Sequence, residues 1–344
     1  MGNQITKNNH YVPQFYLRNW SQDGKTVLTY RTLVSSSSVP MWEPLSIERV
    51  ASHQHLYTIE VNGQPSDEIE KWFNSNFETP AQPAIEKVVA GKHLSREDYQ
   101  LLVKFLVVQM VRTPSWNNYL VNKATELFPK TLESVGKKLE AILKNKETLP
   151  PVAPLVEPNP FQIHVQFSTG DSTNISYIEA EMFIGQKMWL AEIKRLLPRI
   201  IPVLNHHSWC ILEAAPGVDF PTSDDPVVRV GFRSSDNYWF EGVGANQPNA
   251  NIFLPLSPKH LLYTKVGKSQ KSRQLDAEKS NLLRQLIISH ADRHVFSTSV
   301  IKGISAFKPR IVNAELFKAE QTAWNNWHES QREAERDWDS SDMT

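Results

Sequence analysis

Residues 99–111 constrain this 344-residue chain more than any other stretch, because they are apolar on almost every face of a helix. The run follows Ser95, Arg96, Glu97 and Asp98, a pattern typical of a capping box at a helix start. A helix that is apolar all round is buried on all sides. We therefore expect residues 99–111 to form the central helix of the fold.

The composition supplies a large core and excludes several classes of protein. The chain is 40% hydrophobic, with 10 Trp, 15 Phe and 9 Tyr. Lys and Arg number 37, as do Asp and Glu, so a formal net charge of zero does not support bulk attraction to nucleic acid or membranes. The charge balance does not exclude a local basic cleft. The single cysteine, Cys210, lies in a predicted strand and excludes a disulfide framework.

The start of the chain lacks the pattern of a secretory signal. No run of about 18 apolar residues occurs, so no membrane-spanning segment is expected. We therefore expect a soluble, cytoplasmic protein.

Four regions are expected along the chain. Residues 1–148 hold an opening segment and a helical region, and residues 149–160 form a linker with five prolines. Residues 161–314 form an α/β region, and residues 315–344 form a charged, Trp-containing C-terminal helix or tail. The predicted fold class is α+β: a helical N-terminal half braced by the opening segment, and a mixed α/β C-terminal half, in one compact unit.

Apolar periodicity and turn residues locate the other elements. Thr113 and Pro114 begin a helix that runs to about residue 146. Further helices are expected over 175–204, kinked by its prolines, and over 275–289. Strands are expected at 24–30, 55–61, 209–213, 227–230, 251–256, 260–266 and 294–298, the second ending at the hairpin dipeptide Asn62-Gly63. In the tail, Trp324 and Trp327 share a helix face, which indicates docking.

The opening segment, residues 7–20, places a histidine among packed aromatic rings at an end of the chain that is usually frayed. His10 has two interpretations. It could act as a general base held by Pro13, Tyr11 and Phe15. Alternatively, its ring bonds a backbone carbonyl and pins the terminus.

Gln109 and Arg112 lie three residues apart on the apolar helix and therefore point the same way. A buried guanidinium needs a partner, because an unpaired buried charge costs several kcal/mol. Arg112 could pair with an internal carboxylate, Glu70, Glu78 or Glu86. It could instead face a cleft and hold an anion such as phosphate.

A third polar segment, residues 220–226, lies between predicted strands. Asp224 could serve as a base or metal ligand, with Ser223 hydrogen-bonded to a substrate. Asp and Ser before proline are also ordinary turn formers, so a tight turn is the simpler interpretation.

Two weaker signals concern metals and polyanions. His53 and His55 have strand spacing that could pair them on a metal, but no third ligand is evident. The basic run Lys265, Lys268, Lys271 and Arg273 is most simply a solvated loop. It is also the best local candidate for contacting a phosphate backbone.

Four segments follow one another in a recognisable order: KNNHYVPQFYLRN at 7–19, FLVVQMVRTP at 105–114, FPTSDDP at 220–226 and PLSP at 255–258. Together they resemble a mainly bacterial, uncharacterised domain-of-unknown-function family with an HYVP motif (DUF4238). Asp225 stands where we expect Asn to be common in that family, a departure that leaves the turn interpretation intact.

The resemblance implies no reaction, because none is established for the family. It implies that His10, Gln109, Arg112, Ser223 and Asp224 belong to one recurring polar set. Such a set could be a composite active site or a buried network that braces the fold.

Our leading hypothesis is a hydrolase-like effector, of antiviral defence or toxin type, that acts on a nucleotide or nucleic-acid phosphate. His10 and Asp224 would be catalytic, handling protons or a metal-bound water. Gln109, Arg112 and Ser223 would bind the substrate. A divalent metal could serve as the cofactor, and no metal ligand is assigned.

The alternative is a non-enzymatic protein that binds a ligand or partner, in which the polar set is structural. Burial separates the two hypotheses. An open cleft lined by His10, Arg112 and Asp224 favours the enzyme, whereas sealed and paired side chains favour the binding protein.

Overall fold

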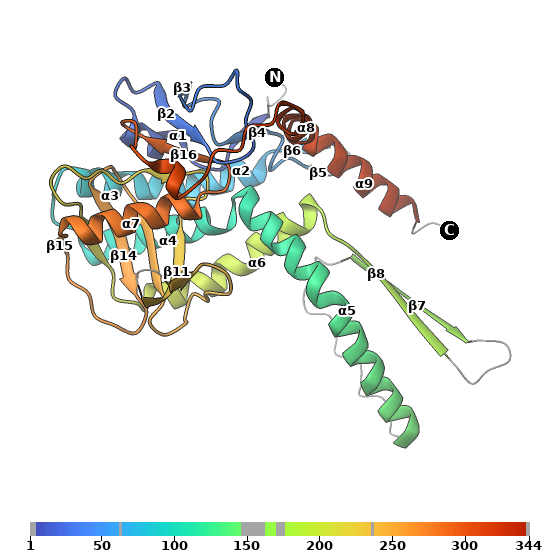
Figure 1. Cartoon of the computed structure of the whole chain (residues 1–344). Coiled ribbons are helices and arrows are strands. Elements are labelled where there is room, and N and C mark those ends of the chain that lie inside the picture. The colour runs from blue at the N-terminus through green and yellow to red at the C-terminus, as the bar shows by residue number, and fades with distance from the viewer. Residues whose placement is uncertain (1–4, 62–63, 146–161, 170–175, 235–236, 342–344) are drawn as a thin grey trace. The chain divides into compact units, whose positions relative to one another are not determined.

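The computed structural model describes residues 5–61, 64–145, 162–169, 176–234 and 237–341, and it has the predicted α+β class (Figure 1). The described chain divides into two compact units. The first is Met1–Ser115 with Lys194–His328, and the second is Trp116–Ile193 with Glu329–Thr344. All four segments of the recurring pattern lie in the first unit, so the two halves do meet there.

The opening segment is tied down as predicted. β1 (Asn8–His10) pairs antiparallel with β4 (Ser52–Gln54), and α1 (Gln14–Leu17) follows directly after Pro13. A 3-10 turn, Arg18–Trp20, then buries its tryptophan ring, whose Nε1 donates to the Phe220 carbonyl over 2.8 Å.

A four-stranded antiparallel sheet joins both ends of the first unit. Its order is β10 (Thr222–Ser223), β16 (His294–Ser297), β2 (Thr26–Arg31) and β3 (Trp42–Ser46). Asp23 starts β2 by accepting from two backbone N–H groups in a turn that also needs Gly24, at φ +71°.

A six-stranded sheet forms the other layer of the first unit. Its order is β12 (Asn237–Trp239), β11 (Val228–Ser234), β13 (Asn251–Pro255), β14 (His260–Lys265), β9 (Cys210–Glu213) and β15 (Arg273–Gln274). α7 (Ala277–His290) packs Leu286 and Ile287 against strand residues such as Phe253. Figure 1 shows α7 in front of this sheet and α4 behind it.

The helical region leads to the predicted central helix. A hairpin of β5 (Ile59–Val61) and β6 (Gln64–Ser66) precedes α2 (Glu68–Phe73), a π-turn (Asn74–Glu78) and α3 (Thr79–Val89). The predicted dipeptide at 62–63 lies outside the described residues. α4 (Arg96–Val111) begins with a complete Ser95–Asp98 capping box, and every residue from 105 to 111 is buried.

The second unit contains most of α5 (Pro114–Asn145) and an antiparallel pair of β7 (Gln162–Thr169) and β8 (Ser176–Phe183). α6 (Gln186–Asn205) begins in this unit and continues into the first unit from Lys194. The helix predicted over 175–204 is therefore wrong for its first part, which is a strand. The Pro-rich segment 149–160 lies outside the described residues.

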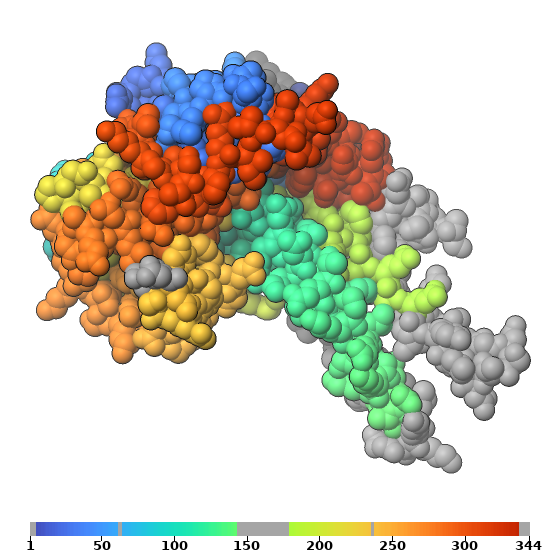
Figure 2. Space-filling model, viewed as in Figure 1, coloured from blue at the N-terminus to red at the C-terminus, as the bar shows by residue number. Residues whose placement is uncertain are grey.

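The C-terminal part of the first unit returns to the N-terminal strands. A 3-10 turn (Ile304–Ala306) precedes α8 (Ala314–Asn325). The next helix, α9 (Trp327–Ser341), lies almost wholly in the second unit. Residue 312 bridges Ser35, and Figure 2 shows the orange-red residues after 300 lying against the blue N-terminal strands. The rings of Trp324 and Trp327 both contact His53, with centroids 4.4 and 5.7 Å away.

Candidate functional site

Arg112 is a sealed structural cation. Its side chain is fully buried at the end of α4, where it forms an ion pair with Glu78 and donates to the His10 carbonyl. Its Nε lies 3.4 Å from the Tyr57 hydroxyl, and its guanidinium lies 4.8 Å from the Phe73 ring centroid. Burial alone would lower the pKa of Arg112, but Glu78, Tyr57 and Glu70 together outweigh it and the pKa is raised. Of the three predicted carboxylates, Glu78 is the direct partner.

His10 is half-buried, and its ring contacts a backbone carbonyl and a neighbouring side-chain amide. Its Nε2 lies 3.3 Å from the Ile47 carbonyl and 3.5 Å from the Gln14 amide. Burial lowers the pKa of His10, and the nearby Arg112 lowers it further. These contacts match the interpretation in which the ring pins the terminus.

Gln109 and Ser223 are also enclosed. Gln109 is fully buried, and both atoms of its amide lack a hydrogen-bond partner among the described residues. The Ser223 hydroxyl donates to the Asp225 carbonyl over 2.8 Å. The structure therefore shows local turn formation by Ser223, and no hydrogen bond joins these two predicted substrate-binding residues within the described part of the chain.

Asp224 holds the backbone that enters β16. Its carboxylate accepts from the N–H groups of Asp292, Arg293 and His294, at 3.2, 2.8 and 3.1 Å. Burial, followed by the charge of Asp292, raises the pKa of Asp224 to about 8. These bonds fix the backbone of Arg293 and His294, whose side chains lie on the far side of the turn from Asp224.

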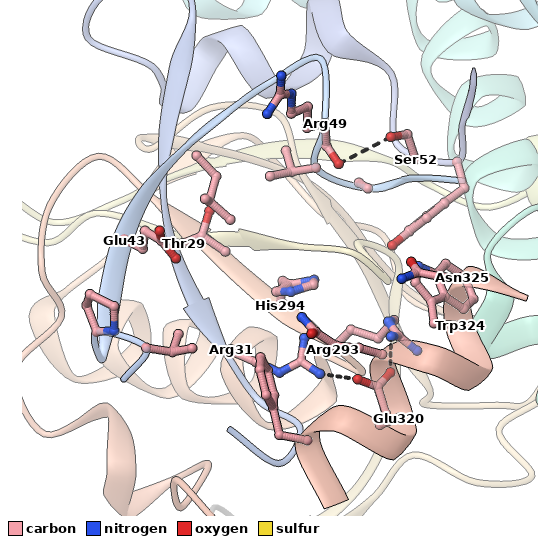
Figure 3. A pocket seen from close by; sticks show the side chains of 18 residues that line it. Thr29, Arg31, Glu43, Arg49, Ser52, Arg293, His294, Glu320, Trp324 and Asn325 are labelled. Carbon is pink, nitrogen blue, oxygen red and sulfur yellow. Dashed lines mark hydrogen bonds and ion pairs between the residues drawn. The ribbon is translucent and has the colours of Figure 1, made fainter. Parts of the chain in front are cut away.

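Those side chains line a cavity of about 340 Å³ in the first unit, the arginine pocket. Its walls come from β2, the segment 39–52, the start of β16 and α8 (Figure 3). The residues that carry its polar chemistry are Tyr11, Arg31, Glu43, Arg49, Arg293, His294 and Glu320. None of the five predicted site residues lines it.

Two guanidiniums in the pocket share one carboxylate. Arg31 and Arg293 each form an ion pair with Glu320, one with each carboxylate oxygen, as the dashed lines in Figure 3 show. The Arg31 guanidinium lies 5.0 Å from the Phe317 ring centroid, and that of Arg293 lies 4.1 Å from the Trp324 ring. All three ionic side chains keep between 13 and 23% of their surface exposed, so solvent reaches them.

The rest of the pocket adds a neutral imidazole and a further cation. Burial and the two arginines lower the pKa of His294 to about 3, and its Nδ1 has no partner among the described residues. Figure 3 places this ring in the middle of the pocket. Arg49 is exposed at the rim, and Glu43 is the second carboxylate in the lining.

One member of the predicted polar set, Asp224, supports the pocket from behind. Asp224 anchors the backbone of Arg293 and His294. The N–H of Tyr11, next to His10 in the opening segment, donates to the Ala51 carbonyl over 2.9 Å and places the tyrosine in the lining. Sequence reasoning missed the pocket because no short motif contains Arg31, Arg293 and Glu320; the β2–β16 pairing brings the two arginines together.

Across the described residues, no group of three or more His, Cys, Asp and Glu side chains is placed to hold a metal ion. His53 and His55 have different partners: His53 contacts Trp324, and His55 stacks on His328 with centroids 4.9 Å apart. Within the described part of the chain, no helix combines the length and apolarity needed to cross a membrane.

A family model described as "Protein of unknown function (DUF4238)" matches residues 8–300. The chain therefore belongs to this family, and the match ends before α8 begins. Comparison with curated proteins and with solved structures found no match.

Proposed function

We propose that this member of the DUF4238 family is a binding protein that takes a small, phosphate-containing ligand in the arginine pocket, and that its recurring polar set is structural. One observation carries the proposal: Arg31 and Arg293 converge on a single anionic group in a cavity that solvent reaches.

The chemistry of the lining fits such a ligand. Guanidiniums bind phosphate and carboxylate oxygens through paired, charge-assisted hydrogen bonds. The neutral ring of His294 supplies a further donor or acceptor, because its Nδ1 is unpaired among the described residues. A volume of about 340 Å³ lies at the small end of ligand sites.

The hydrolase-like effector remains a second hypothesis with less support. It requires His10, Arg112 and Asp224 to meet substrate, yet Arg112 is fully buried and Asp224 is nearly so. Each of these two side chains has its hydrogen bonds inside the protein. Burial of this kind favours the binding protein.

A thermal-shift screen tests the proposal. The probes are pyrophosphate, adenine nucleotides, a short single-stranded DNA and Mg²⁺ alone. A probe at 100 times its Kd should stabilise the protein by about 2.7 kcal/mol. We expect a phosphate-containing probe to raise the Tm of wild type and to lose this effect in Arg293→Ala.

Two variants make the screen specific. Arg233→Ala is the matched control, since Arg233 also lies over a tryptophan, 5.9 Å from the Trp239 ring, but outside the pocket. Arg112→Ala should melt lower because Glu78 loses its buried partner, while keeping the ligand shift. A shift that survives in Arg293→Ala but vanishes in a folded Arg112→Ala protein would overturn the proposal in favour of the effector hypothesis.

A further inference from the structure

Glu320 occupies the position that the proposed function assigns to a ligand. Its two carboxylate oxygens each receive one guanidinium, so the pair Arg31 and Arg293 is already bridged by an anion that belongs to the protein (Figure 3). A carboxylate and a phosphoryl group offer the same paired oxygens to an arginine fork. An incoming phosphate therefore competes with Glu320 for the same donors.

The helix that carries Glu320 contacts the rest of the first unit at this same site. None of the residues of α8 is buried. Phe317 and Trp324 contact the two arginines through their ring faces. A further contact is the hydrogen bond from His53 Nε2 to the Trp324 carbonyl, at 2.6 Å. Because α8 contributes no buried side chain, its release removes no residue from the core.

The charge of the lining also favours exchange. The lining contains Arg31, Arg49 and Arg293 against Glu43 and Glu320. When Glu320 leaves, three arginines face one carboxylate, and a phosphate restores the balance. Glu320 and a bound phosphate therefore exclude each other from the two arginines that they share.

We propose that Glu320 is an internal stand-in for the ligand's phosphate, so that ligand binding displaces it from Arg31 and Arg293 and releases α8 from the pocket. This inference rests on the proposed function of the arginine pocket. α8 then competes with the ligand for the pocket. The docked helix lowers the affinity for the ligand, and the bound ligand lowers the affinity for the helix, by the same factor.

Isothermal titration with pyrophosphate on the full chain tests this competition. Glu320→Gln keeps the shape of the side chain but removes its charge, and we expect it to bind pyrophosphate about tenfold more tightly than wild type, within the usual range of coupling between sites. Glu315→Gln is the matched control, because Glu315 lies in the first turn of the same helix and outside the pocket. Circular dichroism verifies that each variant folds.

Hydrogen exchange reports the helix itself. On adding pyrophosphate to wild type, the amides of residues 314–325 should exchange faster, whereas those of α4 should not change. Tighter binding by Glu320→Gln together with faster exchange of α8 in wild type supports the inference. Pyrophosphate binding that is detected for Glu320→Gln but not for wild type also supports it.

The opposing results are distinct. Pyrophosphate binding of equal or lower affinity in Glu320→Gln, with unchanged exchange in α8, overturns the inference and leaves the proposed function standing. If neither pyrophosphate nor a nucleotide binds wild type or Glu320→Gln, the proposed function fails and the inference fails with it.

Discussion

At the scale of single residues, the protein depends on a buried cation that is fully paired. Arg112 connects the opening segment, the residue 57 turn and the π-turn through His10, Tyr57 and Glu78. Removing one partner of a buried ion pair costs about 3–5 kcal/mol, because the other charge is left uncompensated. This structural role is a sufficient reason for such a residue to recur in a motif.

Glu70 yields a prediction at this scale. Burial raises the pKa of Glu70 from 4.5 to about 7, although Arg112 opposes the shift, and its Oε2 has no partner among the described residues. A carboxyl with a raised pKa in the folded state binds its proton more tightly there than when unfolded. Its stabilising contribution is therefore complete below pH 4.5 and is lost as the pH rises through about 7.

Glu70→Gln cannot titrate, so the fall in unfolding free energy between these pH values should be smaller than in wild type. Urea unfolding at several pH values measures this. Glu97→Gln, at an exposed residue in the first turn of α4, serves as the control and should keep the wild-type profile. Identical profiles for wild type and Glu70→Gln would contradict the assigned protonation.

At the scale of elements, α4 owes its start to local chemistry. The Ser95 hydroxyl accepts from the Asp98 N–H at 3.1 Å, and the Asp98 carboxylate accepts from the Ser95 N–H at 2.8 Å. Lys87 of α3 adds an ion pair with Asp98 at 2.7 Å, so this cap also joins two helices.

Ser95→Ala should therefore lower the free energy of unfolding by about 1 kcal/mol, the usual cost of losing a serine cap. The midpoint of urea unfolding measures the change. Ser37→Ala is the control, because Ser37 is exposed in a turn and should shift the midpoint by less than about 0.5 kcal/mol. An unchanged midpoint for Ser95→Ala would mean that tertiary packing alone positions α4.

Elements set by local signals could be predicted from the sequence, and those set by distant pairing could not. The capping box predicted α4, and apolar runs located β13 and β14 closely. β8 contains Glu179, Ala180, Glu181 and Met182, which favour a helix in isolation, but pairing with β7 overrides that preference.

Some residues of the candidate site could likewise be predicted from the sequence, whereas the pocket could not. The motifs identified residues that hold the frame, because Asp224 and Arg112 act through their immediate surroundings. The pocket depends on which strand pairs with which. Arg31 lies opposite His294 in the β2–β16 register, 263 positions away in sequence, and no spacing rule spans that separation.

At the scale of the whole molecule, a net charge of zero limits the partners. Binding to a polyanion is driven by released counterions and needs a cationic surface. The run from Lys265 to Arg273 is the best local candidate; Lys268, Lys271 and Arg273 are exposed and available to solvent.

We expect no binding of a short DNA duplex at about 0.15 M salt, where charges are screened beyond about 8 Å. Fluorescence anisotropy across a salt series measures this, with the Lys268→Gln/Lys271→Gln double variant beside wild type. Tight binding by wild type that falls steeply with salt and is lost in the double variant would make this run a nucleic-acid surface.

The position of β2 between β3 and β16 has a consequence for synthesis. One edge of β2 pairs with residues 42–46, soon after it is made, but the other waits for residues 294–297. At translation rates of about 5–20 residues per second, that wait lasts roughly 13–50 s. An unpaired strand edge is a template for wrong pairing. The nascent chain therefore carries the strand of Arg31 half-covered until residues 294–297 have been made, and α8 can close over it only afterwards.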